Sequence, residues 1–112
     1  MEIPNGVIVL GSKEGNELGF TVDRFKNSWL WKAENSIYIS LLISIEPGIG
    51  HFNALLDRIW ELGYTVKVPC PLRQMEEIIK KKGFVKTREG TAYSEMVDVW
   101  VKDPPKEKSN EI

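Results

Sequence analysis

The residues of this chain that could do chemistry gather in one short turn, Glu46-Pro47-Gly48-Ile49-Gly50-His51. The turn lies between a stretch that alternates like a strand, 36–45, and a stretch with helical spacing, 51–62. Glycines leave the backbone open to a ligand, and the first N–H groups of a helix have no partner inside that helix. The turn therefore predicts a site where main-chain amides bind an anion such as a phosphate.

Three side chains near this turn are candidates for a further role. Glu46 ends the strand beside the turn, so its carboxylate is the best placed group to take a proton from an amine; the alternative is a solvated turn residue. His51 either faces a phosphate from the first helical turn or is a surface residue at a helix start. Cys70 follows the next strand, where it either approaches a reacting group or fills a small buried space.

Composition limits the classes of protein to which the chain can belong. With 112 residues the chain can form one domain with its own core, and a formal net charge of -1 does not favour nucleic acid or anionic lipid as a partner. Cys70 and His51 are the only residues of their types, so we expect neither an internal disulfide nor a metal site. The chain opens without a basic and apolar leader and has no apolar run of membrane-spanning length, which predicts a cytoplasmic protein without a membrane contact.

The first 45 residues show the alternation of strands and no helical period. Residues 7–10 and 18–22 flank the polar turn 12–16 and predict a hairpin. Residues 28–33 predict a third strand, whose Trp29 and Trp31 share one face. Together with Tyr38 these aromatic residues either line a groove for an acceptor or, as is usual at strand spacing, belong to a core face. Residues 37–45 predict a long central strand, with one face made by Ile37, Ile39, Leu41, Ile43 and Ile45.

The period then changes to that of helices. Residues 51–62 predict a first helix ended by Gly63, and residues 71–82 a second helix ended by Gly83. Shorter alternating stretches predict strands at 64–68, 84–88 and 94–102. The sequence thus predicts a single domain over 1–102 with a disordered tail at 103–112. Its fold class is α+β, with a mixed, mostly antiparallel central sheet and two helices.

Two motifs in this order of elements carry a family resemblance. Gly48-Ile49-Gly50 opens the first helix, Lys81-Lys82-Gly83-Phe84 closes the second, and residues 36–102 together resemble the GNAT-type N-acetyltransferase family. The resemblance implies acetyl-CoA as acyl donor, no metal, and direct transfer of an acetyl group to an amine acceptor, for which a protein is one candidate. It also implies a GNAT-like arrangement of the sheet.

The resemblance assigns binding roles to named positions. In that family a loop of pattern R/Q-x-x-G-x-G/A cradles the pyrophosphate, and the preceding strand pairs with the pantetheine arm. By resemblance, the pyrophosphate is bound by the backbone of Gly48, Ile49, Gly50, His51 and Phe52. The pantetheine arm is paired by the backbone of Ile43 and Ile45, facing the strand that ends at Val68.

The departures from the family pattern leave an alternative open. Ile45 replaces an arginine or glutamine, Ile79 stands where a tyrosine often protonates the CoA thiolate, and residues 1–35 contain no counterpart of the two N-terminal helices. The chain then resembles a divergent, N-terminally shortened member with an open acceptor side. The alternative is a non-catalytic binding protein of the same fold that has lost cofactor use, with an exposed aromatic or apolar patch; a homodimer would cover the same surface.

Overall fold

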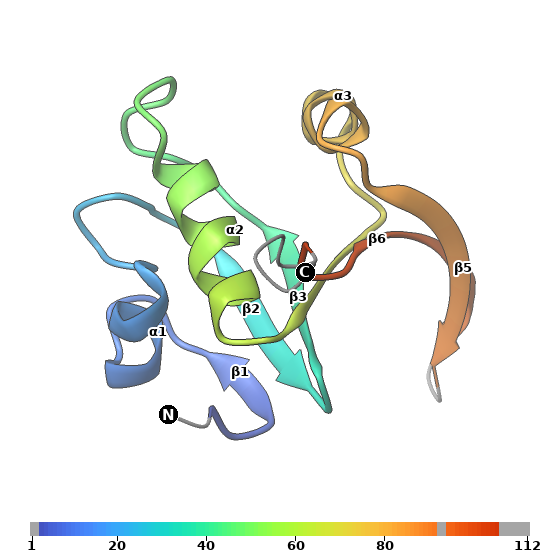
Figure 1. Ribbon diagram of the computed structural model, residues 1–112, viewed down its shortest axis with the longest axis horizontal. Coiled ribbons are helices and arrows are strands. Elements are labelled where there is room, and N and C mark those ends of the chain that lie inside the picture. The colour runs from blue at the N-terminus through green and yellow to red at the C-terminus, as the bar shows by residue number, and fades with distance from the viewer. Residues whose placement is uncertain (1–2, 92–93, 106–112) are drawn as a thin grey trace, which may run out of the picture.

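The computed structural model describes residues 3–91 and 94–105, which form six strands and three helices (Figure 1). In chain order these elements are β1 (Gly6–Ile8), α1 (Lys13–Leu18), β2 (Trp29–Ala33), β3 (Ser36–Leu41), α2 (His51–Glu61), β4 (Thr65–Pro69), α3 (Arg73–Lys81), β5 (Val85–Thr91) and β6 (Ser94–Lys102). The helices predicted at 51–62 and 71–82 are confirmed as α2 and α3, and the strand predicted at 94–102 is confirmed as β6. Residues 103–105 have no regular structure, and the rest of the predicted tail, 106–112, lies outside the described residues.

The strands form one sheet in the order β1-β2-β3-β4-β6-β5. All neighbours are antiparallel except β3 and β4, which run parallel because α2 carries the chain from the end of one strand back to the start of the other. The predicted α+β class with a mixed, mostly antiparallel sheet is therefore confirmed.

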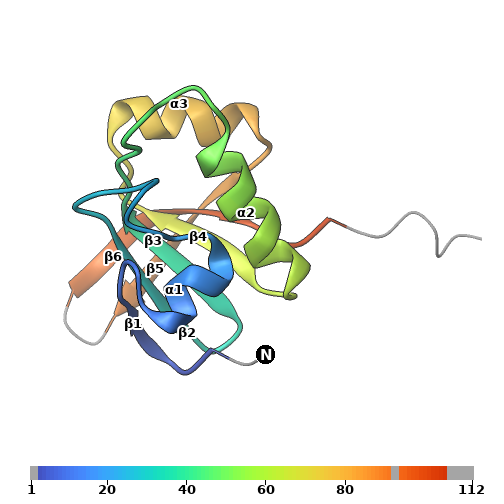
Figure 2. The ribbon, with the colours of Figure 1, turned by 90° about the vertical axis from the view of Figure 1, so that its left-hand side faces the viewer.

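The core lies between one face of the sheet and the helices α2 and α3, which lie on the same side of the sheet (Figure 2). It joins alternate residues of the central strands to the inner faces of both helices: Ile37, Ile39, Val66, Val68, Leu55, Leu56, Ile59 and Ile79. Full burial of an aliphatic side chain contributes about 1.5–3 kcal/mol, so this cluster fixes β3, β4 and α2 relative to one another.

The N-terminal hairpin predicted from residues 7–10 and 18–22 is wrong, because the segment between these stretches forms the helix α1. The Ser12 Oγ accepts a hydrogen bond from the Gly15 N–H at 3.0 Å and caps the start of the helix. Gly19 ends it in the left-handed conformation, with φ 81°. Leu18 is completely buried. A helix of six residues is too short to show a hydrophobic period, so its caps and the burial of Leu18 stabilise it, and the described chain has three helices instead of two.

The strand predicted at 37–45 ends at Leu41 in β3, and its pairing with β2 is interrupted one residue earlier. Leu30 pairs with Ile39 and Trp29 with Leu41, which leaves Ser40 between them without a partner. The predicted single apolar face does not continue through this bulge. Ile37 and Ile39 are buried, whereas Ile45 is 45% exposed.

The face of the sheet opposite the core, called here the open face, is covered by no helix of the described residues (Figures 1 and 2). Trp29 and Trp31 lie on it, since Leu30 between them is the buried residue of β2. Trp29 is 58% exposed, and the Trp31 ring stacks on the Tyr38 ring with centroids 5.0 Å apart. The expectation that these two tryptophans belong to a core face is therefore wrong.

Candidate functional site

The central feature of the site is a separation of the two parallel strands. β3 and β4 pair only over 36–38 and 65–67. Beyond this point β3 stays paired with β2 as far as Leu41, and β4 stays paired with β6 as far as Pro69. The sheet therefore opens between its two halves at the ends of these strands.

A small cavity of about 50 Å³ lies in this opening. Its lining comes from the end of β3 and the following residue on one side and from β4 and the start of α3 on the other: Ile39, Ser40, Leu41, Leu42, Val68, Pro71, Leu72 and Met75. We call this cavity the strand gap. Because nearly all of its lining is apolar, it suits an uncharged part of a ligand.

The predicted glycine turn follows the end of β3 and leads into α2. Residues 45–50 are all exposed, and Gly48 and Gly50 have φ values of 91° and 93°. A Cβ added at either glycine would meet no atom within 4 Å, so the backbone conformation, and not close packing, requires glycine here. Within the described part of the chain, no hydrogen bond is donated by the N–H groups from Gly48 to Asn53. The predicted row of free amides is therefore present at the start of α2.

His51 and Phe52 contribute their backbone to this row, and both side chains are half-buried. The His51 ring makes an edge contact with Phe25, with centroids 6.3 Å apart. The hydrogen bond from the Thr21 hydroxyl lowers the pKa of Asp23, and the nearby His51 adds a smaller effect in the same direction. The histidine side chain is thus held against residues 21–25, while its N–H group stays free.

Lys82, which belongs to the motif that closes the second helix but to which the sequence assigns no binding role, lies at the first turn of α2. The Lys82 Nζ, at the end of α3, donates a hydrogen bond to the Asn53 Oδ1 and lies 5.9 Å from the centre of the Phe52 ring. In the sequence, Lys80-Lys81-Lys82 reads as a solvated helix end. The signal that could have distinguished Lys82 is its spacing of three residues from Ile79, which turns it toward the buried side of α3.

The backbone of Ile43 and Ile45, predicted to pair with a ligand, already has partners. The Ile43 N–H donates to the Ser28 Oγ at 2.9 Å, and the Ile43 carbonyl accepts from the Lys26 N–H at 3.0 Å. The Ile45 N–H donates to the Arg24 carbonyl at 2.8 Å. These groups therefore face the segment 24–28, away from β4.

The remaining candidate side chains lie in different surroundings. Glu46 is exposed in the turn, and no ion pair with it is present among the described residues. Ile79 is completely buried in the core. Cys70 is exposed and lines a separate cavity of about 420 Å³ with Arg88 and Trp100. The structure thus brings together the glycine turn, the start of α2 and Lys82, and it leaves Cys70 outside the strand gap.

No helix of the described residues is both long and apolar enough to cross a bilayer, and these residues contain no group of three His, Cys, Asp or Glu side chains arranged to hold a metal ion. Comparison of the chain with known protein families, with curated proteins and with solved structures finds no match. Function is therefore inferred from the geometry of the site.

Proposed function

We propose that this chain is an acyl-CoA-dependent N-acetyltransferase-like protein that transfers an acetyl group directly to an amine acceptor. The observation that supports this most is the strand gap, which opens after the paired residues Tyr38 and Lys67 next to the turn that begins α2. This order of features suits a long ligand with an anionic end and an uncharged arm. Acetyl-CoA has such a shape, with its diphosphate at one end and its thioester at the other.

The diphosphate would lie at the start of α2. The free N–H groups from Gly48 to Asn53 are donors for its oxygens, and the positive end of the helix dipole favours an anion. Lys82 adds a full positive charge beside Asn53. Glu46 opposes binding, but at an exposed separation of a few Å this costs only about 1 kcal/mol.

The pantetheine arm would lie along the opening between β3 and β4, and only its inner end would enter the strand gap, whose volume of about 50 Å³ is too small for the whole arm. Peptide groups alternate in direction along an extended chain, and those of Ile43 face the segment 24–28. The polar groups of Leu42 and Ser44 then face the other way, toward the gap. We therefore assign the pairing with the amides of the arm to Leu42 and Ser44 in place of Ile43 and Ile45.

The transfer itself would depend mainly on positioning. The amine nitrogen attacks the thioester carbonyl carbon, the C–S bond breaks, and CoA leaves as a thiolate that takes a proton from solvent. The proton of the amine goes to Glu46, directly or through water. Since Ile79 is buried and apolar, no side chain at that position donates a proton to the thiolate. Holding the thioester at the inner end of the gap supplies most of the rate enhancement.

The second candidate is a non-catalytic protein of similar architecture that binds a partner and no cofactor. The open face favours it, because Trp29 and Val7 are 58% and 61% exposed there. The two functions differ in one property that is simple to measure, the affinity for CoA.

Thermal unfolding with CoA and acetyl-CoA tests the proposal. A ligand at one hundred times its Kd stabilises the folded state by about 2.7 kcal/mol, so a millimolar ligand should raise the Tm by several degrees. Met75→Trp should abolish this shift, because the larger side chain fills the strand gap. Ile78→Trp, a change at a 39% exposed position of the same helix, should preserve it. An unchanged Tm of the parent protein at millimolar CoA would contradict the proposal.

A further inference from the structure

We propose that the open face of the sheet is the interface of a homodimer, in which two copies pack sheet against sheet about a two-fold axis. This inference does not depend on CoA binding. It rests on the shape, charge and area of the face.

One half of the open face carries a raised cluster, called here the aromatic ridge: Val7, Trp29, Trp31 and Tyr38. Val7 pairs with Trp31 across β1 and β2, and Trp31 pairs with Tyr38 across β2 and β3, so the four residues are neighbours on one surface. Trp29 and Val7 are more than half exposed, and the stack of Trp31 on Tyr38 holds these two rings in a fixed orientation. Large, ordered aromatic side chains of this kind are typical of the centres of protein interfaces.

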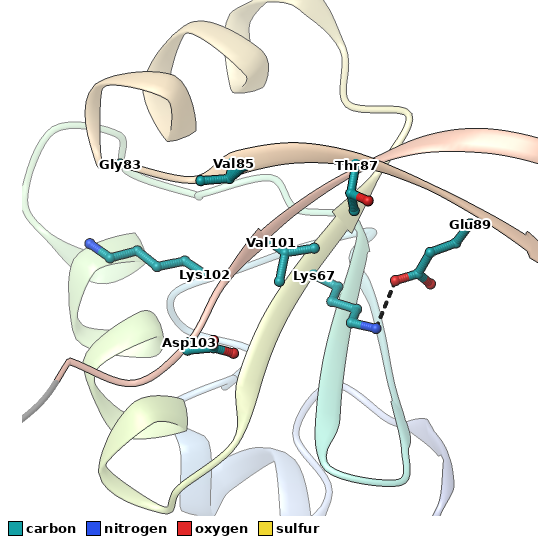
Figure 3. A pocket seen from close by; sticks show the side chains of 8 residues that line it. All are labelled: Lys67, Gly83, Val85, Thr87, Glu89, Val101, Lys102 and Asp103. Carbon is teal, nitrogen blue, oxygen red and sulfur yellow. Dashed lines mark hydrogen bonds and ion pairs between the residues drawn. The ribbon is translucent and has the colours of Figure 1, made fainter.

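The other half carries a hollow, called here the trough, with a volume of about 490 Å³ (Figure 3). Val85 and Thr87 of β5 and Val101 of β6 line it, together with Gly83 and four charged residues, Lys67, Glu89, Lys102 and Asp103. Val85 lies on the edge strand β5, and its side chain is 67% exposed. The trough is therefore a depression with both apolar and charged side chains, and apolar side chains of a partner could pack against Val85 and Val101.

An ion pair lies at the side of the trough that adjoins the ridge. The Lys67 Nζ lies 2.7 Å from the Glu89 Oε2 (Figure 3). The Tyr38 hydroxyl donates a hydrogen bond to the Glu89 Oε1 at 3.2 Å. The two charges neutralise each other, so the middle of the face attracts neither a polyanion nor a polycation. In a two-fold pair, the same two charges would also lie next to their opposites in the partner.

These features are self-complementary. A rotation by 180° about an axis near the ion pair brings the ridge of each copy over the trough of the other, so that the contact between ridge and trough forms twice. Neighbouring strands lie about 4.8 Å apart, so six strands span about 24 Å. The four strands of five to seven residues, β2 to β5, are about 17–23 Å long, which gives a face of about 400–550 Å² per copy. The pair would then cover about 800–1,100 Å², at the lower end for specific interfaces, which points to a weak dimer with a micromolar Kd.

Light scattering after size exclusion, over a concentration series to about 100 μM with a reductant present, tests the inference. We expect the protein to become dimeric across this range. Trp29→Lys puts a charge into the trough of the partner, and Thr87→Glu puts a charge under its ridge, so each variant alone should dimerise roughly thirtyfold more weakly. An equimolar mixture should recover dimers, because one heterodimer contact places the introduced lysine beside the introduced glutamate and the other contact is unchanged.

Val22→Lys is the matched control. Val22 is 66% exposed but lies in the segment between α1 and β2, outside the sheet, so this variant should dimerise like the parent protein. Far-ultraviolet circular dichroism confirms that each variant is folded. A monomeric parent protein at about 100 μM would overturn the inference, as would dimers unaffected by Trp29→Lys or a mixture that stays monomeric.

Discussion

Tyr38 and Lys67 are the last residues at which the parallel strands β3 and β4 remain paired, and their side chains contact each other on the open face. The Lys67 Nζ lies 5.4 Å from the centre of the Tyr38 ring, and both side chains bind the carboxylate of Glu89 from β5. A cluster from three strands thus holds the sheet together at the point where the strand gap opens. The same residues link the proposed cofactor site on one side of the sheet to the proposed interface on the other.

The ion pair of this cluster predicts a pH dependence of stability. Burial acts to lower the pKa of Lys67, but its hydrogen bond to Glu89 and the charges of Tyr38 and Glu89 outweigh burial and raise that pKa above its usual value. A raised pKa in the folded state stabilises the protein at pH values below the unfolded pKa, and this contribution is lost as the pH rises through the folded pKa. Lys67→Met should therefore cost about 1 kcal/mol at pH 7 and progressively less above about pH 10.4. Urea unfolding at pH 7 and above about pH 10.4 measures how the free energy of unfolding changes on substitution. The exposed Lys26→Met is the control. A cost of Lys67→Met that stays the same at high pH would argue against the ion pair.

Substitutions in the glycine turn should affect both stability and ligand binding, whereas the same substitutions at a matched glycine elsewhere should affect stability alone. Gly48 and Gly63 have the same φ of 91°, and a Cβ at either position would meet no atom within 4 Å. Alanine at either position should therefore lower the free energy of unfolding by about 1–2 kcal/mol through left-handed strain alone. Asparagine should cost less, because it tolerates this conformation. Only the Gly48 variants should weaken CoA binding in a calorimetric titration, and an equal loss of affinity at Gly63 would mean that the turn has no specific role.

Lys82 predicts an electrostatic contribution to CoA binding. Lys82→Gln removes the positive charge next to Asn53, and a loss of about 1 kcal/mol corresponds to roughly fivefold weaker binding at low salt. The effect should shrink as ionic strength rises, because the site is close to solvent. Lys81→Gln is the control, since this exposed neighbour makes no hydrogen bond, ion pair or cation–π contact with α2 among the described residues. Equal losses in both variants would indicate a diffuse charge effect and no specific role for Lys82.

The short helix α1 predicts a measurable capping energy. Ser12→Ala removes the acceptor for the Gly15 N–H and should lower the free energy of unfolding by about 1 kcal/mol, whereas Ser12→Thr should retain most of it. Denaturant unfolding of the three proteins provides the comparison. If alanine costs no more than threonine, the cap does not hold this helix.

The sequence by itself determined the elements whose signals are local. The apolar spacing of 51–62 and 71–82 requires helices, and the alternation of 94–102 requires a strand, because one face of each must be buried. The glycines at 48 and 50 likewise predicted a turn with free amides before α2, since conformational freedom belongs to the residue itself. For these segments, neighbouring residues contain all the information that the fold uses.

Only the tertiary structure decided the relations between distant segments. The alternation in 28–33 places Leu30 on one face of the strand and Trp29 and Trp31 on the other. The side of the sheet on which the helices pack then decides which of these faces is buried. The bulge at Ser40, which changes the direction of the following backbone groups, exists only in the pairing of β3 with β2. Lys82 reaches the start of α2, and β3 separates from β4, for the same physical reason: both depend on packing between residues far apart in the chain, which no local pattern records.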